Sequence, residues 1–244
     1  MIRTIWVGLH VATATLSLGS LAILASLLRV RGRLYSNLTR SWARWILWAS
    51  DTPLTVHGRE HIRLDEPQVV VSNHVSGYDI FAIAVALPVP FAFVAKKELE
   101  RIPFFGTAWK AAGHISLDRS NRQQAVHSLQ RAGERIRREK STVIIYPEGT
   151  RSRTGELLEF KKGAFMLAVE AQVPVVPTVV VGTREIIDSR SWRIHPRPIH
   201  LYFEPPVSTA GYSADNAEEL MRLVRSRMLE RLDAVRLPPQ RASR

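Results

Sequence analysis

A histidine and an aspartate stand five residues apart where the chain passes from a predicted strand to a predicted helix. His74 and Asp79 belong to residues 73–79, which follow the apolar run 68–72 and precede the apolar run 80–87. The first run is typical of a buried strand and the second of a buried helix. Five steps along a continuous helix would turn a side chain by about 500°. The two residues can therefore meet only if His74 lies on the incoming loop and Asp79 in or near the first helical turn.

General base catalysis is the chemistry that this pair can perform. Gly77 makes the required bend inexpensive, and a carboxylate in the first helical turn is favoured by the helix dipole. If Asp79 accepts from one imidazole nitrogen of His74, the other nitrogen is left as a free base. This is the histidine–aspartate half of a serine-protease triad without its serine. The missing hydroxyl could belong to the substrate; the alternative is a histidine with a purely structural role.

Basic side chains follow two of the other predicted strands. Lys97 comes after the predicted strand 91–95, and Arg119 after the predicted strand 114–117. They could converge on an anion, because charge-assisted hydrogen bonds are strong. A solvated basic loop would show the same pattern.

A second polar turn directly follows another predicted strand and carries Glu148, Gly149, Thr150 and Arg151. The guanidinium of Arg151 offers planar paired donors that suit a phosphate. Lys162 then opens a predicted helix, where backbone N–H groups and a lysine favour an anion. Phosphate binding is the function that these residues indicate.

The net charge of the 244-residue chain is +12, with 34 Lys and Arg against 22 Asp and Glu. This balance favours an anionic partner: nucleic acid, anionic lipid or a phosphorylated substrate. The chain contains no cysteine. Disulfides, thiol catalysis and thiolate metal sites are therefore excluded.

The first 48 residues differ from the rest of the chain. Residues 5–28 carry no formally charged side chain and are long enough to span a bilayer. Before the first acidic residue come Arg29, Arg31, Arg33, Arg40 and Arg44. If the segment spans, this positive flank holds the main domain in the cytoplasm. Its polar residues leave a helix lying in the membrane interface as the alternative.

Three tryptophans follow at intervals of three residues, Trp42, Trp45 and Trp48. On a helix they would form one aromatic face beside Arg40 and Arg44, as in an interfacial helix. The alternative is that they pack on the globular domain.

The rest of the chain alternates between strand and helix patterns. Predicted strands are 69–72, 91–95, 114–117, 142–146, 175–181 and 199–203, and predicted helices are 80–87, 120–140, 165–171 and a terminal helix through Leu220, Val224 and Met228. This alternation predicts an α/β fold with a mostly parallel mixed sheet flanked by helices. We expect a membrane-associated helical segment over 1–48, one domain over 49–236 and a disordered tail over 237–244.

Four groups of residues stand in the order and approximate spacing of the four sequence blocks of glycerolipid acyltransferases. They are Asn73-His74 with Asp79, Lys97-Glu98-Leu99 with Pro103 and Gly106, residues 148–152, and residues 173–177. The chain thus resembles bacterial 1-acyl-glycerol-3-phosphate (lysophosphatidic acid) acyltransferases. The resemblance covers under half of the chain and is weaker at the N-terminus.

The resemblance implies transfer of an acyl group from acyl-CoA or acyl carrier protein to the 2-hydroxyl of lysophosphatidic acid. The product would be phosphatidic acid, for phospholipid biosynthesis, and no cofactor would be needed. His74 would act as general base and then as general acid, while Asp79 fixes its tautomer. An oxyanion donor could be a backbone N–H near Gly77 or Gly149.

The resemblance also implies how the other candidates divide their roles. The substrate-binding candidates are Arg151, Glu148, Gly149, Thr150, Lys97, Arg119 and Lys162. The acceptor phosphate would lie against the basic members of this set, and Glu148 would orient Arg151 or the loop. No metal is expected, because the histidine and aspartate lack companion ligands at suitable spacing.

Two rival functions remain at this point. One is an acyltransferase for another lyso-lipid, such as a lyso-ornithine lipid. The other is a non-catalytic membrane-binding or nucleic-acid-binding protein, which explains the charge but not the four ordered blocks. We expect no nucleic-acid partner, because there is no stacking platform of the kind that reads RNA. The expected location is a bacterial inner membrane, with the catalytic domain facing the cytoplasm.

Overall fold

The computed structural model describes residues 1–30, 32–117, 132–133, 136, 138, 140–187 and 193–236. Most of the predicted helix 120–140 lies outside these residues. So do the candidate Arg119 and the predicted tail 237–244.

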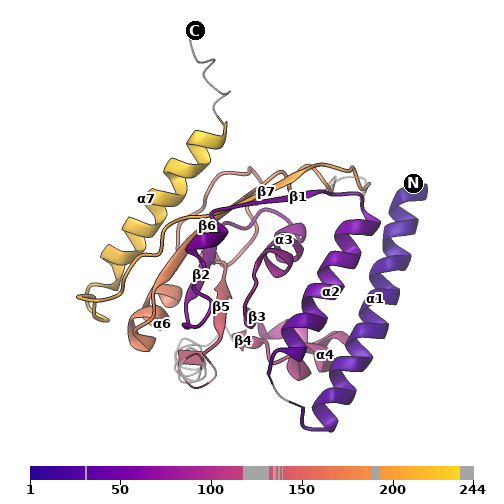
Figure 1. The fold of residues 1–244 in the computed structure, drawn as a ribbon. Coiled ribbons are helices and arrows are strands. Elements are labelled where there is room, and N and C mark those ends of the chain that lie inside the picture. Colours follow the sequence, from indigo (N-terminus) through magenta and orange to yellow (C-terminus); the bar gives the residue numbers. More distant parts are fainter. Residues whose placement is uncertain are drawn as a thin grey trace.

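Within the described residues, a seven-stranded sheet forms the centre of the molecule, in the order β1-β7-β6-β2-β5-β3-β4 (Figure 1). The strands are β1 (Leu54–His57), β2 (Val69–Ser72), β3 (Phe91–Lys96), β4 (Ile115–Leu117), β5 (Thr142–Ile145), β6 (Val175–Val181) and β7 (Ile199–Phe203). The β6–β7 pair is antiparallel, and the other described pairs are parallel. The predicted mostly parallel mixed sheet is confirmed.

The strand β1 was not predicted from the sequence, whereas all six predicted strands form with ends that differ by at most one residue. β1 is four residues long and its side chains alternate between half-buried and exposed. So short an alternation gives little signal, because it lacks the continuous apolar run of a strand buried on both faces.

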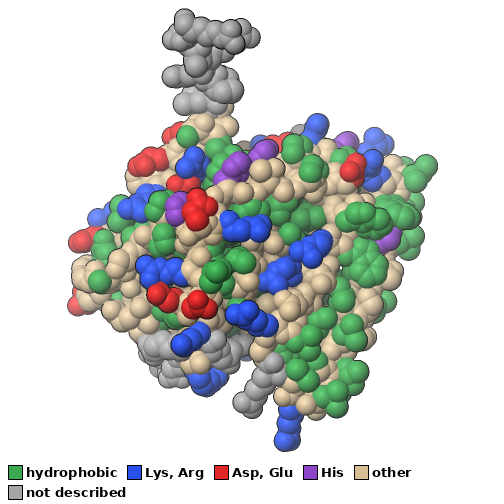
Figure 2. All heavy atoms as spheres, in the orientation of Figure 1, with side chains coloured by type: hydrophobic (Ala, Val, Ile, Leu, Met, Phe, Trp, Pro, Cys, Tyr) green, Lys and Arg blue, Asp and Glu red, His purple; other side chains and the backbone are tan. Residues whose placement is uncertain are grey.

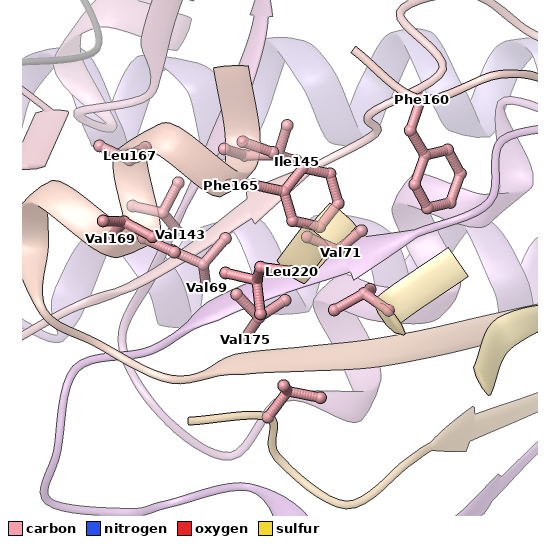
Figure 3. Packing of buried hydrophobic residues seen from close by; sticks show 14 of the residues in the cluster. Val69, Val71, Val143, Ile145, Phe160, Phe165, Leu167, Val169, Val175 and Leu220 are labelled. Atoms are coloured by element: carbon pink, nitrogen blue, oxygen red, sulfur yellow. The ribbon is translucent and has the colours of Figure 1, made fainter. Parts of the chain in front are cut away.

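Two layers of helices cover the sheet. The helices are α1 (Ile2–Leu27), α2 (Leu34–Ala49), α3 (Tyr78–Ala86), α4 (Phe105–Ala111), α6 (Gly163–Ala171) and α7 (Ala217–Arg236), with 3₁₀ turns η1 (Arg59–His61) and η2 (Lys97–Arg101). On one face, α6 and α7 pack Phe165, Leu167 and Leu220 against the valines of the central strands (Figure 3). On the other face, α2 and α3 enclose a second core.

The helix α1 is long and apolar enough to cross a membrane, by length and composition, and so indicates membrane association. It lies beside α2 on the flank of the molecule (Figure 1). One face of α1 packs on the folded body: a Cβ on Gly19 would lie 2.7 Å from a ring carbon of Phe104, and Ala14 is fully buried. The opposite face exposes large apolar side chains, among them Leu9, Leu16 and Leu24.

The tryptophans of α2 mainly join helices to one another. Trp42 stacks edge-to-face on Phe81 of α3 with ring centroids 5.0 Å apart. The Trp45 indole donates to Nδ1 of His10 in α1 at 2.9 Å. Trp48 is the exposed one of the three, at 66%. Trp42 therefore packs on the globular domain rather than forming part of a membrane-facing aromatic surface. The helix α2 belongs to the folded body.

Arg40 also has an internal role that the sequence did not indicate. Its guanidinium donates to the carbonyl oxygen of Leu87 at 2.7 and 3.1 Å and to that of Val89 at 3.2 Å. These bonds satisfy carbonyl groups at the C-terminal end of α3. Burial, and then the charge of Arg44, lower the pKa of Arg40. Arg40 is thus not available at a membrane surface in the way the basic flank suggested.

Candidate active site

Three adjacent strands bring their carboxyl ends together at one edge of the sheet. The central strand β2 is parallel to β5 on one side and to β6 on the other. The crevice beyond such ends is where open α/β sheets bind their ligands. The segments that follow β2, β5 and β6 carry the residues described below.

The expected meeting of the histidine and the aspartate is confirmed. His74 lies on the loop after β2, and Asp79 is the second residue of α3. Nδ1 of His74 is 2.9 Å from Oδ2 of Asp79. Because an ionised carboxylate can only accept, Nδ1 carries the proton and the other ring nitrogen is left as the base. The side chain of His74 is 13% exposed, while that of Asp79 is fully buried.

The loop itself locks the carboxylate in place. Oδ2 of Asp79 accepts from the backbone N–H of Val75 at 2.7 Å and of Ser76 at 2.8 Å. These two bonds close the tight turn between β2 and α3 around the aspartate. The loop and the carboxylate thus hold His74 in the orientation in which Nδ1 faces Asp79.

Glu148 holds the backbone of the two neighbouring loops. Its carboxylate accepts from the N–H of His74 at 2.7 Å and of Leu158 at 3.0 Å, and the side chain is almost fully buried. Burial raises the pKa of Glu148, and these two N–H bonds partly oppose that effect. The backbone N–H of Ser152 adds a bond to the His74 carbonyl at 2.8 Å. The sequence left two roles for Glu148, to orient Arg151 or to orient the loop. Its contacts are those of a residue that orients the loop.

Tyr146 forms the wall behind the imidazole. Its ring stacks on that of His74, with centroids 4.1 Å apart and planes at 21°. The pKa of Tyr146 is raised well above its usual value, mainly by burial and then by the charge of Asp79. Its hydroxyl is buried and has no hydrogen-bond partner among the described residues. The stack limits rotation of the imidazole.

A pocket of about 1660 Å³ opens in front of His74. The loops after the strands line it with polar and basic side chains, including Thr150, Arg151, Arg153, Arg184 and His195. The helices α1 to α4, with the turn before α4, line it with apolar side chains, including Leu18, Ala22, Phe81, Ile102, Phe105 and Trp109. The pocket is therefore basic on one side and apolar on the other.

The predicted binding residues divide into two groups. Gly149, Thr150 and Arg151 line the pocket, and the Arg151 guanidinium lies 3.8 Å from where a Cβ on Gly77 would be. Lys162 instead lies 3.9 Å from Glu218 of α7 and is not among the lining residues. Lys97 opens η2 and does not line the pocket, whereas Lys96 does.

Sequence reasoning missed several residues at the site. Arg153 and Arg184 line the pocket together, and Arg184 donates to the Arg153 carbonyl at 3.0 Å. Lys161 places its Nζ 3.0 Å from where a Cβ on Gly149 would be. Arg184 follows a predicted strand end, as Arg151 does, and that placement was the signal available for it. The described residues contain no group of three or more potential metal ligands.

The comparisons with known proteins agree with this geometry. The acyltransferase family model matches residues 53–181. The chain is 32% identical over 212 residues to 1-acyl-sn-glycerol-3-phosphate acyltransferase of Limnanthes douglasii, covering 86% of this chain and 74% of the relative. It is 34% identical over 212 residues to the human alpha enzyme of the same name, covering 86% and 75%.

A solved structure is also similar over almost the whole chain. It is the 1-acyl-sn-glycerophosphate (LPA) acyltransferase PlsC from Thermotoga maritima, with a TM-score of 0.82 and 27% identity, covering 98% of this chain and 97% of that one. The fold, the site and these matches define an acyltransferase. This chain belongs to the 1-acyl-sn-glycerol-3-phosphate acyltransferase family.

Proposed function

We propose that the protein transfers an acyl group from a thioester to the sn-2 hydroxyl of 1-acyl-glycerol-3-phosphate, giving phosphatidic acid. The observation that carries this proposal is the hydrogen-bonded His74–Asp79 pair at a pocket that is basic on one side and apolar on the other. The acceptor and the product both combine a phosphate with acyl chains. The pocket matches that combination better than it matches a purely ionic or a purely apolar ligand.

In the proposed reaction His74 removes the proton of the acceptor hydroxyl as the oxygen attacks the thioester carbonyl carbon. The tetrahedral intermediate then expels the thiolate, which takes the proton back from His74. Asp79 holds the tautomer and stabilises the imidazolium between the two steps. Every proton is accounted for within the dyad and the two substrates, so we propose that no further cofactor takes part.

The oxyanion donor in this proposal is the N–H of Gly77. That group makes no hydrogen bond within the described part of the chain, whereas the N–H of Gly149 already donates to the Tyr146 carbonyl at 3.1 Å. Gly77 is also the first residue before α3, where backbone N–H groups favour negative charge.

We assign the acceptor phosphate to Arg151, with Arg153 and Arg184 completing the basic side of the pocket. Arg151 is the predicted candidate that lies beside the catalytic loop, because its guanidinium approaches Gly77. A guanidinium binds phosphate with two parallel hydrogen bonds. The apolar side of the pocket takes an acyl chain. The donor thioester in this proposal is acyl-CoA or acyl carrier protein.

We propose that α1 lies in the interface of the membrane. Packing on Phe104 and Trp42 keeps α1 against the globular body, so it cannot cross the bilayer while that body stays in water. Its exposed apolar face forms the flank seen in Figure 2, and basic side chains lie on the neighbouring face. This arrangement suits an anionic membrane surface. In a bacterium the surface would be the cytoplasmic face of the inner membrane, where acyl thioesters are available.

The test of the proposed function is acyl transfer from radiolabelled acyl-CoA and, in parallel, from radiolabelled acyl carrier protein to a panel of lyso-lipid acceptors presented in vesicles. We expect transfer to 1-acyl-glycerol-3-phosphate, and much less to lyso-ornithine lipid or lysophosphatidylcholine. His74→Ala should lose about 10²–10⁴-fold in rate, the usual contribution of a general base. His57→Ala, exposed on the edge strand β1, is the matched control and should keep its rate. Equal transfer to acceptors without a phosphate monoester would overturn the proposed acceptor.

A further inference from the structure

The carboxylate of Asp79 is fully buried, and its only ion-pair partner among the described residues is His74. A buried charge is tolerated when hydrogen bonds satisfy it. Oδ2 has three donors: the His74 imidazole, the Val75 N–H and the Ser76 N–H. The donor to Oδ1 is the hydroxyl of Thr183, at 2.5 Å. Thr183 is itself fully buried.

Thr183 reaches the site through the pairing of β6 with β2. The two strands are parallel, with Ser72 opposite Thr178. The Asn73 side chain extends this pairing: it donates to the Val180 carbonyl at 2.9 Å and accepts from the Val180 N–H at 2.8 Å. The end of β6 is thereby fixed beside the His74 loop.

The turn after β6 then directs Thr183 inward. Gly182 has a φ of +90°, and a Cβ on it would lie 2.2 Å from the Pro198 carbonyl oxygen. A glycine is needed here because other residues rarely adopt this conformation and no space exists for a side chain. The residue that follows is Thr183, which lies beyond both the four sequence blocks and the residues matched by the family model.

We propose that Thr183 is a positioning residue for the catalytic pair: its hydroxyl fixes the Asp79 carboxylate in the rotation that directs Oδ2 at His74. This inference rests on the proposed function, because it assigns Thr183 a part in the same reaction. Thr183 does not touch the substrate and acts through Asp79. Without the hydroxyl, Oδ1 would be a buried oxygen with no donor, and the negatively charged state of the pair would lose a charge-assisted hydrogen bond.

Removing the Thr183 hydroxyl should shift the pH dependence of the rate in one direction. When His74 is neutral, the negative charge of Asp79 has no positive partner, and the Thr183 hydroxyl then stabilises it most. When His74 is protonated, its own charge balances Asp79 and the hydroxyl adds less. Removing it should therefore make the proton of the pair harder to remove.

Other titratable groups also face the pair or its pocket, and the substitutions below leave them in place. They are Tyr146, Glu148, Arg151 and Arg153 after β5, Arg184 and Glu185 after β6, His195 before β7, and Lys96 and His114 on the β3 side.

The test compares Thr183→Val with Thr183→Ser in the acyl-transfer assay. Valine keeps the shape and removes the donor, and we expect kcat to fall about 10–100-fold, as for one hydrogen bond to a charged group. The KM for the acceptor should change little. The acid side of the pH–rate profile should move to higher pH by about 0.5–1 unit. Serine keeps the hydroxyl and should retain most of the activity.

Thr178→Val is the matched control, since Thr178 is a fully buried residue of β6, the strand before Thr183, and its hydroxyl donates to the Val176 carbonyl rather than to the site. It should leave kcat and the pH–rate profile unchanged. In an Asp79→Asn background, Thr183→Val should lower kcat by a smaller factor than it does in the wild type, because the charge that the hydroxyl supports is already absent.

Two results would overturn the inference: full activity of Thr183→Val, or a fall in kcat without any pH shift and with equal loss in the Asp79→Asn background. If the wild-type protein transfers no acyl group, the proposed function fails instead. The two failures are thus distinguishable.

Discussion

Replacing Asp79 by asparagine isolates the charge of the aspartate from its hydrogen bonds. Oδ2 accepts hydrogen bonds from three N–H groups. Because an amide nitrogen cannot accept, the oxygen of an asparagine must take the place of Oδ2. The amide nitrogen then faces the Thr183 hydroxyl, which can accept. His74 should therefore keep its tautomer. We expect Tm to change by no more than about 2–4 °C, corresponding to about 1 kcal/mol.

The magnitude follows from the distance between the two side chains. An imidazolium and a carboxylate 2.9 Å apart attract each other by about 6 kcal/mol at an effective dielectric constant of about 20. That energy corresponds to an upper limit of about 10⁴ in rate, if all of it develops in the transition state. In the variant, rearrangement of neighbouring groups around the imidazolium recovers part of this lost energy. We therefore expect kcat of Asp79→Asn to fall about 10²–10⁴-fold.

The measurement is kcat and KM for 1-acyl-glycerol-3-phosphate, together with Tm. The KM for the acceptor should stay within about threefold of wild type, because Asp79 is buried behind His74 and the effect belongs to the chemical step. Asp233→Asn, at an exposed position of α7, controls for the loss of one negative charge and should change neither parameter. A variant that folds normally and keeps more than about a tenth of the wild-type kcat would refute the role of the charge.

Two further predictions concern the phosphate and the membrane. Arg151→Lys should raise the KM for the acceptor by about tenfold and that for the donor less, because lysine lacks the paired donors; an unchanged acceptor KM would move the phosphate to Arg153 and Arg184. Replacing the exposed Leu9 and Leu16 of α1 by glutamine should weaken binding to anionic vesicles by about 10²-fold, because two leucine side chains no longer enter the membrane. Activity on a short-chain, water-dispersed acceptor should be kept. Binding that is unchanged in a sedimentation assay would contradict the interfacial position of α1.

The helical segment 1–48 cannot simply be deleted to test its membrane role. Ala43 and Leu47 of α2 are buried in the core that α3 shares, so deletion would expose that core to water. Substitutions on the exposed face of α1 avoid this problem. The boundary at residue 48, which composition indicated, is a boundary of hydropathy rather than of packing.

The sequence by itself determined six of the described strands and the reacting pair. The strands β2, β3, β5 and β6 are buried along most of their length and appear as continuous apolar runs, so they could be predicted with ends correct to within one residue. His74 and Asp79 were identifiable because the five-residue spacing, with Gly77 between, allows contact only across a strand–helix turn. Glu148 to Arg151 were identifiable because they follow a strand end. All these features are local, and local geometry is what sequence spacing encodes.

Only the tertiary structure decided which distant groups join that pair. Thr183 lies 104 residues from Asp79, and its place depends on the pairing of β6 with β2 and on one left-handed glycine. Lys162 resembled a phosphate ligand in sequence but faces Glu218, because the start of α6 lies near α7. Arg40 and Trp42 resembled a membrane face, yet they satisfy the end of α3 and pack on Phe81. In each case the side chain could serve either role, and the neighbour supplied by the fold selected one.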